Sequence, residues 1–315
     1  MAPLKGITDA LFRQVFTAHF PGLDRAVAPF INPQKSPRYP DKLIADLMPA
    51  DNGAMPLVPQ ILNNDVDGFV ALGNRLFDLG YSEINWNLGC PVKMVAGKRR
   101  GSGLLPYPDA ITHILDRVVP KLKPKLSIKM RLGYEDHRES LVLLPRLEHY
   151  PLASITIHAR LGVQLYGGSV NLDHFDQCRA LTTHRLIYNG DLVSRDTFLE
   201  FAGRFAAIDG WMIGRGLLMN PFLPAEIKGY SYSGHDRIEK LQLFHAALFA
   251  ALKSKLSGPG HLLGRMKQVW IYFGSAFPGQ EKRVKKVIRS TTEKTYLQAV
   301  EKIFSAQTHY LNTLE

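Results

Sequence analysis

The chain has 315 residues, of which 45% are apolar, and a formal net charge of +11. This length can hold one large barrel, or a large domain with a smaller one. No apolar run is long enough to cross a bilayer and no signal-peptide core opens the chain, so we expect a cytoplasmic protein with no membrane segment. The only two cysteines, Cys90 and Cys178, form no CxxC pair, which argues against a disulfide framework and against a bound metal.

The positive charge is concentrated near the end of the chain. Residues 231–315 contain 13 Lys+Arg and 6 Asp+Glu, a net charge of +7, whereas residues 1–230 carry only +4. A basic segment of this kind favours a polyanionic partner, with nucleic acid first. The alternative is an ordinary solvated helix face.

Strand-like runs alternate with helical stretches through the first 230 residues. The predicted strands are 2–4, 26–30, 57–62, 82–87, 126–131, 154–158, 185–189 and 210–213, and helical patterns between them include 65–79, 108–118 and 194–201. This alternation predicts a (β/α)8 TIM barrel. A doubly wound sheet is the alternative, but no G-x-G-x-x-G follows the first strand. That strand is almost absent, so either it is a stub or native residues precede Met1.

The pattern changes after residue 230. A Gly/Ser/Tyr-containing linker at 231–235 is followed by helical stretches at 236–256, 261–274, 280–290 and 292–313. We therefore expect a barrel domain at 1–230 and a C-terminal helical bundle domain at 231–315. Nothing in the sequence demands more than a monomer.

The run at 82–91 reads as a short strand that ends in an abrupt turn. Asn85 and Asn87 alternate with apolar residues, and Cys90 lies in the turn between a glycine and a proline. Two amides and a thiol at the end of an otherwise apolar strand suggest a site. The alternative is a small buried thiol that only fills space.

Polar residues follow most of the other predicted strands. In a barrel of this kind the chemistry lies where the strands run into the following loops. The strand-end residues are Pro3, Leu4, Lys5, Gln60, Asn87, Cys90, Lys129, Arg131, His158, Arg160, Asn189, Gly190, Asp191, Gly214 and Arg215. Glycines after the last two strands expose backbone N–H groups that suit a phosphorylated ligand, although ordinary tight turns also use glycine. Lys129 within a barrel strand needs an anionic or electron-rich partner, whereas His158 and Gln60 could equally be core residues.

Several of these segments together resemble the tRNA-dihydrouridine synthases. They are Ala2-Pro-Leu-Lys-Gly-Ile-Thr-Asp9, Gln60, Asn87-Leu-Gly-Cys-Pro-Val-Lys93, Lys129-Met-Arg-Leu-Gly133, His158-Ala-Arg160, Tyr188-Asn-Gly-Asp191 and Met212-Ile-Gly-Arg-Gly216. The later run Gly264-Arg-Met-Lys-Gln268 is similar to the tail of the C-type bacterial enzymes, which act on the D-loop uridine at position sixteen.

The resemblance implies an FMN-binding barrel followed by a helical tRNA-binding domain. The implied FMN contacts are Pro3, Leu4, Lys5, Gln60, Lys129, His158, Asn189, Gly190, Asp191, Gly214 and Arg215. NADPH would reduce FMN, a hydride would pass from reduced FMN to C6 of the uracil, and Cys90 would deliver a proton to C5. Asn87, Arg131 and Arg160 would lie near the substrate, and the implied tRNA contacts are Lys98, Arg99, Arg100, Arg265, Lys267 and Trp270.

Two other functions stay open at this point. One is a flavin barrel that reduces a small pyrimidine or an enone without RNA. The other is a tRNA-binding protein without turnover. The sequence shows no nicotinamide motif, so the choice between NADPH and NADH is not determined.

Overall fold

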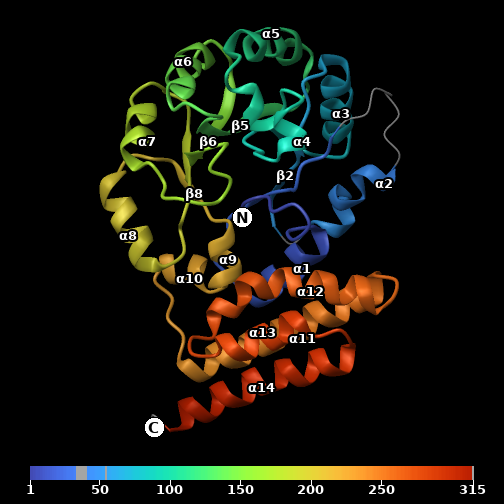
Figure 1. The fold of residues 1–315 in the computed structure, drawn as a ribbon. Coiled ribbons are helices and arrows are strands. Elements are labelled where there is room, and N and C mark those ends of the chain that lie inside the picture. Colours follow the sequence, from blue (N-terminus) through green and yellow to red (C-terminus); the bar gives the residue numbers. More distant parts are fainter. Residues whose placement is uncertain (33–40, 54, 314–315) are drawn as a thin grey trace. The chain divides into compact units, whose positions relative to one another are not determined.

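The computed structural model describes residues 1–32, 41–53 and 55–313, which pack into two compact units (Figure 1). The first unit comprises Met1–Pro3, Arg25–Leu192 and Leu199–Gly214. The second comprises Leu4–Asp24, Val193–Phe198 and Arg215–Glu315.

The first unit is built on parallel strands that follow one another in chain order. They are β1 (Ala26–Val27), β2 (Leu57–Val58), β3 (Gln60–Ile61), β4 (Glu83–Leu88), β5 (Lys125–Gly133), β6 (Leu152–Leu161), β7 (Leu186–Asn189) and β8 (Gly210–Met212). β1 pairs with β2, and β3 to β8 form a six-stranded sheet. Parallel pairing with helical crossovers is the arrangement that the alternating pattern predicted.

Backbone hydrogen bonds of the first two residues close the ring of strands. The N–H of Ala2 donates to the carbonyl of Ile213 (2.8 Å), and the N–H of Val27 donates to the carbonyl of Met1 (3.1 Å). β2 and β3 are two halves of one strand interrupted at Pro59, which has no N–H to give to a ladder. The predicted (β/α)8 barrel is therefore confirmed. The strand predicted at 2–4 is reduced to the backbone bonds of Met1 and Ala2, which precede β1.

The helices agree closely with the predicted stretches. They are α1 (Ala10–His19), α2 (Asp41–Ile44), α3 (Val66–Asp78), α4 (Lys93–Ala96), α5 (Pro108–Val118), α6 (Arg138–Leu147), α7 (Leu172–Arg179), α8 (Arg195–Arg204), α9 (Arg215–Met219), α10 (Leu223–Ile227), α11 (Gly234–Lys255), α12 (Pro259–Phe273), α13 (Glu281–Arg289) and α14 (Glu293–Asn312).

Alternation along β4 separates the core from the barrel interior. Trp86 packs edge-on against Phe69 of α3 with ring centroids 5.8 Å apart, and its indole N–H donates to the carbonyl of Asn63. Its neighbours Asn85 and Asn87 lie on the other face of the strand, where both form hydrogen bonds with the side chain of Gln60 on β3. The period of two thus places the amides inside the barrel.

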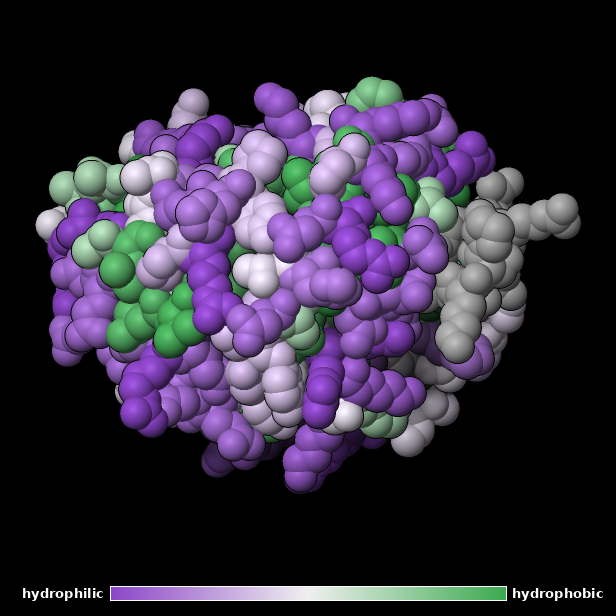
Figure 2. Space-filling model, turned by 90° about the horizontal axis from the view of Figure 1, so that it is seen from above, coloured by the Kyte–Doolittle hydropathy of each residue, from purple (hydrophilic) through white to green (hydrophobic). Residues whose placement is uncertain are grey.

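The face of the molecule in Figure 2 is predominantly hydrophilic, with hydrophobic side chains in small groups. Single exposed apolar residues such as Val142 are ordinary on a protein surface. Within the described residues, none of the helices combines the length and the apolar character that crossing a membrane requires.

The second unit is helical and has an aromatic core. Phe12, Phe16 and Phe20 recur at helical spacing around α1, and all three rings lie within 6.0 Å of the ring of Phe244 on α11. Offset and edge-on ring contacts of this kind add to the stabilisation from burial. Segment 4–24 is therefore part of the same core as the C-terminal helices.

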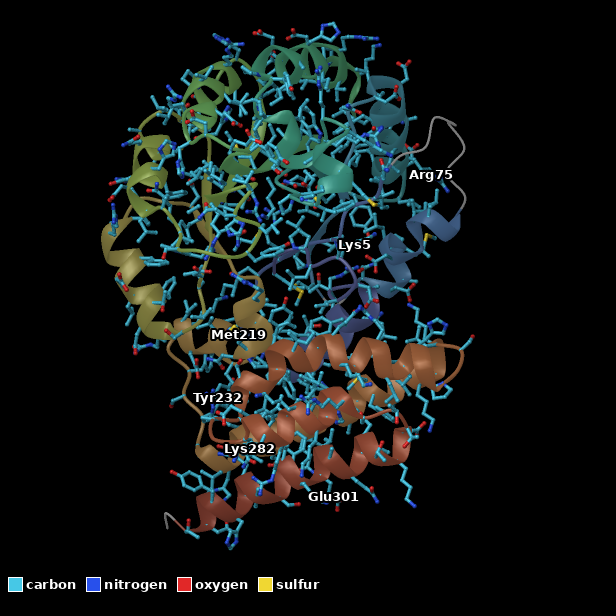
Figure 3. The ribbon with its side chains drawn as sticks, viewed as in Figure 1. Lys5, Arg75, Met219, Tyr232, Lys282 and Glu301 are labelled. Carbon is cyan, nitrogen blue, oxygen red and sulfur yellow. The ribbon has the colours of Figure 1, made fainter. Side chains whose placement is uncertain are left out.

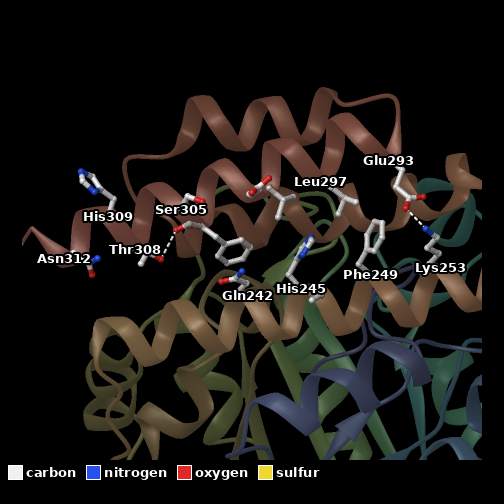
Figure 4. Close-up of a pocket in the computed structure, with 14 residues that line it drawn as sticks. Gln242, His245, Phe249, Lys253, Glu293, Leu297, Ser305, Thr308, His309 and Asn312 are labelled. Atoms are coloured by element: carbon white, nitrogen blue, oxygen red, sulfur yellow. Dashed lines mark hydrogen bonds and ion pairs between the residues drawn. The ribbon is translucent and has the colours of Figure 1, made fainter.

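A groove of ≈ 910 Å³ lies between α11 and α14 within this unit (Figure 4). His245 lies at its floor and pairs with the hydroxyl of Tyr296 (2.6 Å), which also accepts from the indole N–H of Trp270 (2.8 Å). Burial lowers the pKa of His245 to about 4, so this imidazole is neutral at pH 7.

Candidate active site

Cys90 lies just beyond the end of β4, in a loop that side-chain and backbone bonds hold in place. The side-chain oxygen of Asn87 accepts from the backbone N–H of Gly89 (3.0 Å) and of Cys90 (2.8 Å). Burial raises the pKa of the Cys90 thiol above its ordinary value of 9.0, whereas the Val92 N–H and the charges of Arg131 and Lys129 act in the opposite direction. The thiol is consequently protonated at neutral pH, the state that a proton donor needs.

Segment 101–104 supports this loop from the other side, although it has no strand or helix pattern in the sequence. Both the backbone N–H and the hydroxyl of Ser102 donate to the carbonyl of Cys90, each at 3.0 Å. Gly101 has φ 56°, and a Cβ there would lie 2.6 Å from the same carbonyl oxygen. Small residues in Gly101-Ser-Gly103 were the only sequence signal of this close approach.

Lys129 projects from β5 into the barrel interior, as predicted. Its ammonium donates to the side-chain oxygen of Asn189 (3.0 Å), whose amide nitrogen donates to the carbonyl of Met212 (2.7 Å). Burial, and then the charge of Arg131, lowers the pKa of Lys129 to about 7. A cation held in this way favours a ligand that brings negative charge.

Arg131, two residues further along β5, joins the Cys90 loop to the end of β6 and to the loop that follows it. Its Nε donates to the carbonyl of Gly89 (3.0 Å) and its NH1 to the carbonyl of Leu161 (2.7 Å), and its guanidinium lies 5.5 Å from the ring centroid of Tyr166. The side chain is almost fully buried. Arg131 therefore fixes the Cys90 loop and leaves a positive charge beside the thiol.

Arg160, Asp191 and His158 form a second polar cluster at the ends of β6 and β7. The guanidinium of Arg160 pairs with both carboxylate oxygens of Asp191 (2.9 and 2.5 Å) and donates to the carbonyls of Gly167 and Gly168. Its NH1 also approaches Nε2 of His158 at 3.3 Å. These contacts engage every side of the guanidinium, so Arg160 ties the loop after β6 to the end of β7.

The remaining predicted site residues are divided between the two units. Pro3 and Gly214 belong to the first unit, whereas Leu4, Lys5 (labelled in Figure 3) and Arg215 belong to the second. Lys98 and Arg99 are exposed, and Arg100 donates to the side-chain oxygens of Asn64 (3.0 Å) and Asn32 (3.3 Å).

The three residues predicted on α12 contact their own unit. Arg265 pairs with Asp9 (2.6 Å), and Lys267 donates to the carbonyl of Ser290. Trp270 is fully buried and has no exposed surface through which it could touch RNA. Among the exposed cations of this unit, a group lies on α13.

The polar groups that converge in the barrel suit a flat, electron-rich ring with an anionic part. The primary amide of Asn87 is a donor for a ring carbonyl oxygen, and the ammonium of Lys129 is a second donor that also supplies positive charge. Within the described parts of the chain, no group of three or more His, Cys, Asp or Glu residues is placed to hold a metal ion.

Comparisons with known proteins give a family and a fold. The family model described as dihydrouridine synthase (Dus) matches residues 1–308. A relative named tRNA-dihydrouridine synthase B from Pasteurella multocida is 32% identical over 225 residues, which are 71% of this chain and 66% of that protein. A probable tRNA-dihydrouridine synthase from Staphylococcus epidermidis is 32% identical over 260 residues, covering 79% and 77%. Among solved structures, an old yellow enzyme homologue from Zymomonas mobilis aligns with a TM-score of 0.51 at 10% identity, over 75% of this chain and 93% of that one.

Proposed function

The chain belongs to the dihydrouridine synthase family, and from that premise we propose that it reduces a uridine of tRNA to 5,6-dihydrouridine with a bound FMN. NADPH is the proposed reductant, and position sixteen of the D-loop is the proposed target. The two relatives described above carry a B-type name and no type, so the likeness to the C-type tail is what supports that position. We propose that the protein acts as a cytoplasmic monomer.

The observation that carries the proposal is a protonated, buried thiol beside two cations at the mouth of the barrel. Cys90 holds a proton on Sγ, and Arg131 and Lys129 favour the thiolate that remains once this proton has gone to C5 of the uracil. When bound, FMN supplies the hydride chemistry. The residues of the first unit that we expect to hold it are Pro3, Gln60, Lys129, His158, Asn189, Gly190, Asp191 and Gly214.

The decisive experiment uses purified protein, NADPH and tRNA that lacks dihydrouridine. We expect RNA-dependent dihydrouridine, and mapping of the product would identify the modified position. Oxidation of NADPH by small enones without RNA would favour the small-molecule reductase, and RNA binding without turnover would favour the non-catalytic tRNA-binding protein.

The lowered pKa of Lys129 gives a pH dependence for cofactor binding. The ammonium is half deprotonated at about pH 7, and a ligand with negative charge favours the protonated form. We expect the affinity for FMN to fall roughly tenfold between pH 7 and pH 8.5, measured by fluorescence titration of the apoprotein. Lys129→Met should bind FMN more weakly and without this dependence, whereas exposed Lys121→Met should behave like the wild type. Wild-type affinity that stays flat over this range would contradict the prediction.

The exposed stripe on α13 is the proposed contact with tRNA phosphates. Lys282 (labelled in Figure 3), Lys285, Lys286 and Arg289 are all exposed, and each lies three or four residues from two of the others. Like charges at this spacing destabilise a helix by about 0.2–0.5 kcal/mol per pair. A polyanion on the stripe removes that repulsion.

Replacing both Lys285 and Lys286 by Gln tests this stripe. We expect weaker tRNA binding and a salt dependence, as log K against log salt concentration, that is shallower by about 2. Lys121→Gln with Lys125→Gln removes the same charge beside the start of β5 and should leave the slope unchanged. Equal slopes for the two double variants would rule α13 out as a phosphate contact.

A further inference from the structure

Beneath Cys90, a layer of buried polar side chains occupies the barrel interior where branched apolar residues are usual. Gln60, Asn85 and Ser127 are at most 2% exposed. Asn85 is in register with Gln60 on one side and with Ser127 on the other. Burying an amide costs free energy unless its hydrogen bonds are made, so an apolar layer here would fold more easily. The proposed reaction assigns no role to Asn85 or Ser127.

These side chains form one continuous chain of hydrogen bonds that leads up to the Cys90 loop. Asn87 Nδ2 donates to Gln60 Oε1 (2.8 Å), and Gln60 Nε2 donates to Asn85 Oδ1 (2.7 Å). Asn85 Nδ2 donates to Ser127 Oγ (3.0 Å), whose hydroxyl donates to the carbonyl of Ile84 (3.1 Å). Every link therefore runs in the same direction.

The direction of the chain follows from its two ends, where backbone groups leave no choice. The N–H groups of Gly89 and Cys90 can only donate, so the atom of Asn87 that faces them is oxygen. Its nitrogen then faces Gln60, and the same reasoning orients Gln60 and Asn85 in turn. At the lower end, the carbonyl of Ile84 can only accept, which turns the Ser127 hydroxyl toward it and its lone pairs toward Asn85.

A fixed direction has a chemical consequence. Each amide nitrogen carries two N–H groups, of which the chain uses one, so Asn87, which is 7% exposed, keeps an N–H for a ligand, whereas Gln60 is fully buried and holds Asn87 in place. Carbonyl oxygens of a pyrimidine or flavin ring need a donor of this kind. A reversed Asn87 would place its oxygen there instead and repel them.

We propose that Asn85 and Ser127 are positioning residues of the tRNA reduction, which fix the amides of Gln60 and Asn87 and through them the Cys90 loop. This inference rests on the proposed function for the reaction itself. Neither residue needs to touch substrate or cofactor. Both act by keeping the Asn87 donor turned toward the ring and the thiol at a constant position.

The test compares Asn85→Leu and Ser127→Ala with the wild-type holoenzyme. We expect kcat to fall about 10- to 100-fold while the KM for tRNA changes less than about twofold, because remote tRNA contacts are intact. The visible absorption maxima of the bound flavin should shift. The pH profile of Cys90 alkylation by iodoacetamide should also move, measured with Cys178→Ala in every protein so that a single thiol reacts.

Two matched variants separate positioning from general damage. Ser127→Thr keeps the hydroxyl and should recover most of kcat. Ser154→Ala shortens another buried serine, on β6 and outside the chain of hydrogen bonds, and should match the wild type in every readout. If Asn85→Leu fails to fold, Ser127→Ala and Ser127→Thr carry the test.

An unchanged alkylation profile and flavin spectrum in folded Asn85→Leu and Ser127→Ala would overturn the inference. Failure of the proposed function would appear differently, because the wild type itself would make no dihydrouridine. A shifted alkylation profile in the variants would then still show that the chain positions Cys90.

Discussion

Replacing Cys90 by Ala should abolish dihydrouridine formation while FMN stays bound. The thiol is the proposed donor of the proton to C5, and a positioned general acid contributes about 10²- to 10⁴-fold to a rate. The side chains proposed to hold the cofactor, such as the bonded pair of Lys129 and Asn189, do not use Sγ. Single-turnover formation of dihydrouridine in tRNA measures the loss, and the flavin absorbance of the purified variant measures retention.

Cys178 provides a matched control for this experiment. It is also a buried free thiol, and burial raises its pKa to about 11, but it lies on α7 and bonds to the hydroxyl of Ser140. Cys178→Ala should therefore keep full turnover. A Cys90→Ala protein that is colourless and takes up no FMN would instead identify Cys90 as a structural thiol.

The pH dependence of turnover offers an independent check of the same assignment. Burial raises the pKa of Cys90, so the protonated thiol is the dominant form through neutral pH. The rate of the proton-transfer step should fall only as the pH rises through this raised pKa. A wild-type rate that increases over that interval would contradict a role of Cys90 as the acid.

Strand periodicity made the barrel and much of the site predictable from sequence. Asn85, Asn87, Lys129 and Arg131 lie at alternate positions of two strands, so local pattern alone puts them on one face. Chain order then brings those strands side by side, because parallel neighbours connected by helices follow one another around a barrel. The absence of an apolar run at the start of the chain also predicted that the first strand would be very short, as it is at Met1–Ala2.

Contacts that depend on the closed ring were not predictable in this way. Ser102 approaches Cys90 from a segment with no strand or helix pattern. The bonding partners of Arg160 lie at 167–168 and at Asp191, and no sequence spacing links them. The long-range partner of a side chain depends on how the loops fold over the strand ends. Residue types alone do not specify that folding.

That segment 4–24 belongs to the second unit could also not be predicted from the sequence. Phenylalanines at spacings of four on α1 indicate a buried helix face without indicating what covers it. The cover is Phe244 on α11, more than 200 residues later. The functional division at residue 230, into a catalytic and a tRNA-binding domain, stays a prediction.

Asp191→Asn should destabilise the first unit by about 2 kcal/mol, somewhat less than breaking a fully buried ion pair costs. Arg160 has only 2% of its side chain exposed, whereas Asp191, its bidentate partner, has 31% exposed. The amide removes the negative charge but keeps one acceptor oxygen, which limits the loss. Asn also tolerates the positive φ of 43° at this position, so backbone strain adds little. Urea unfolding monitored by circular dichroism gives the free energy of unfolding.

An exposed pair of the same residue types shows what burial contributes. Arg204 and Asp173 also form an ion pair in the first unit, but 37% and 86% of their side chains are exposed. Asp173→Asn should therefore change the free energy of unfolding by less than about 1 kcal/mol, because water already solvates both charges. If the two variants lose the same stability, the charge of Asp191 is not what holds the loop after β6. If Asp191→Asn loses much more stability than Asp173→Asn, the buried guanidinium of Arg160 needs the charge of Asp191 to hold the loop after β6.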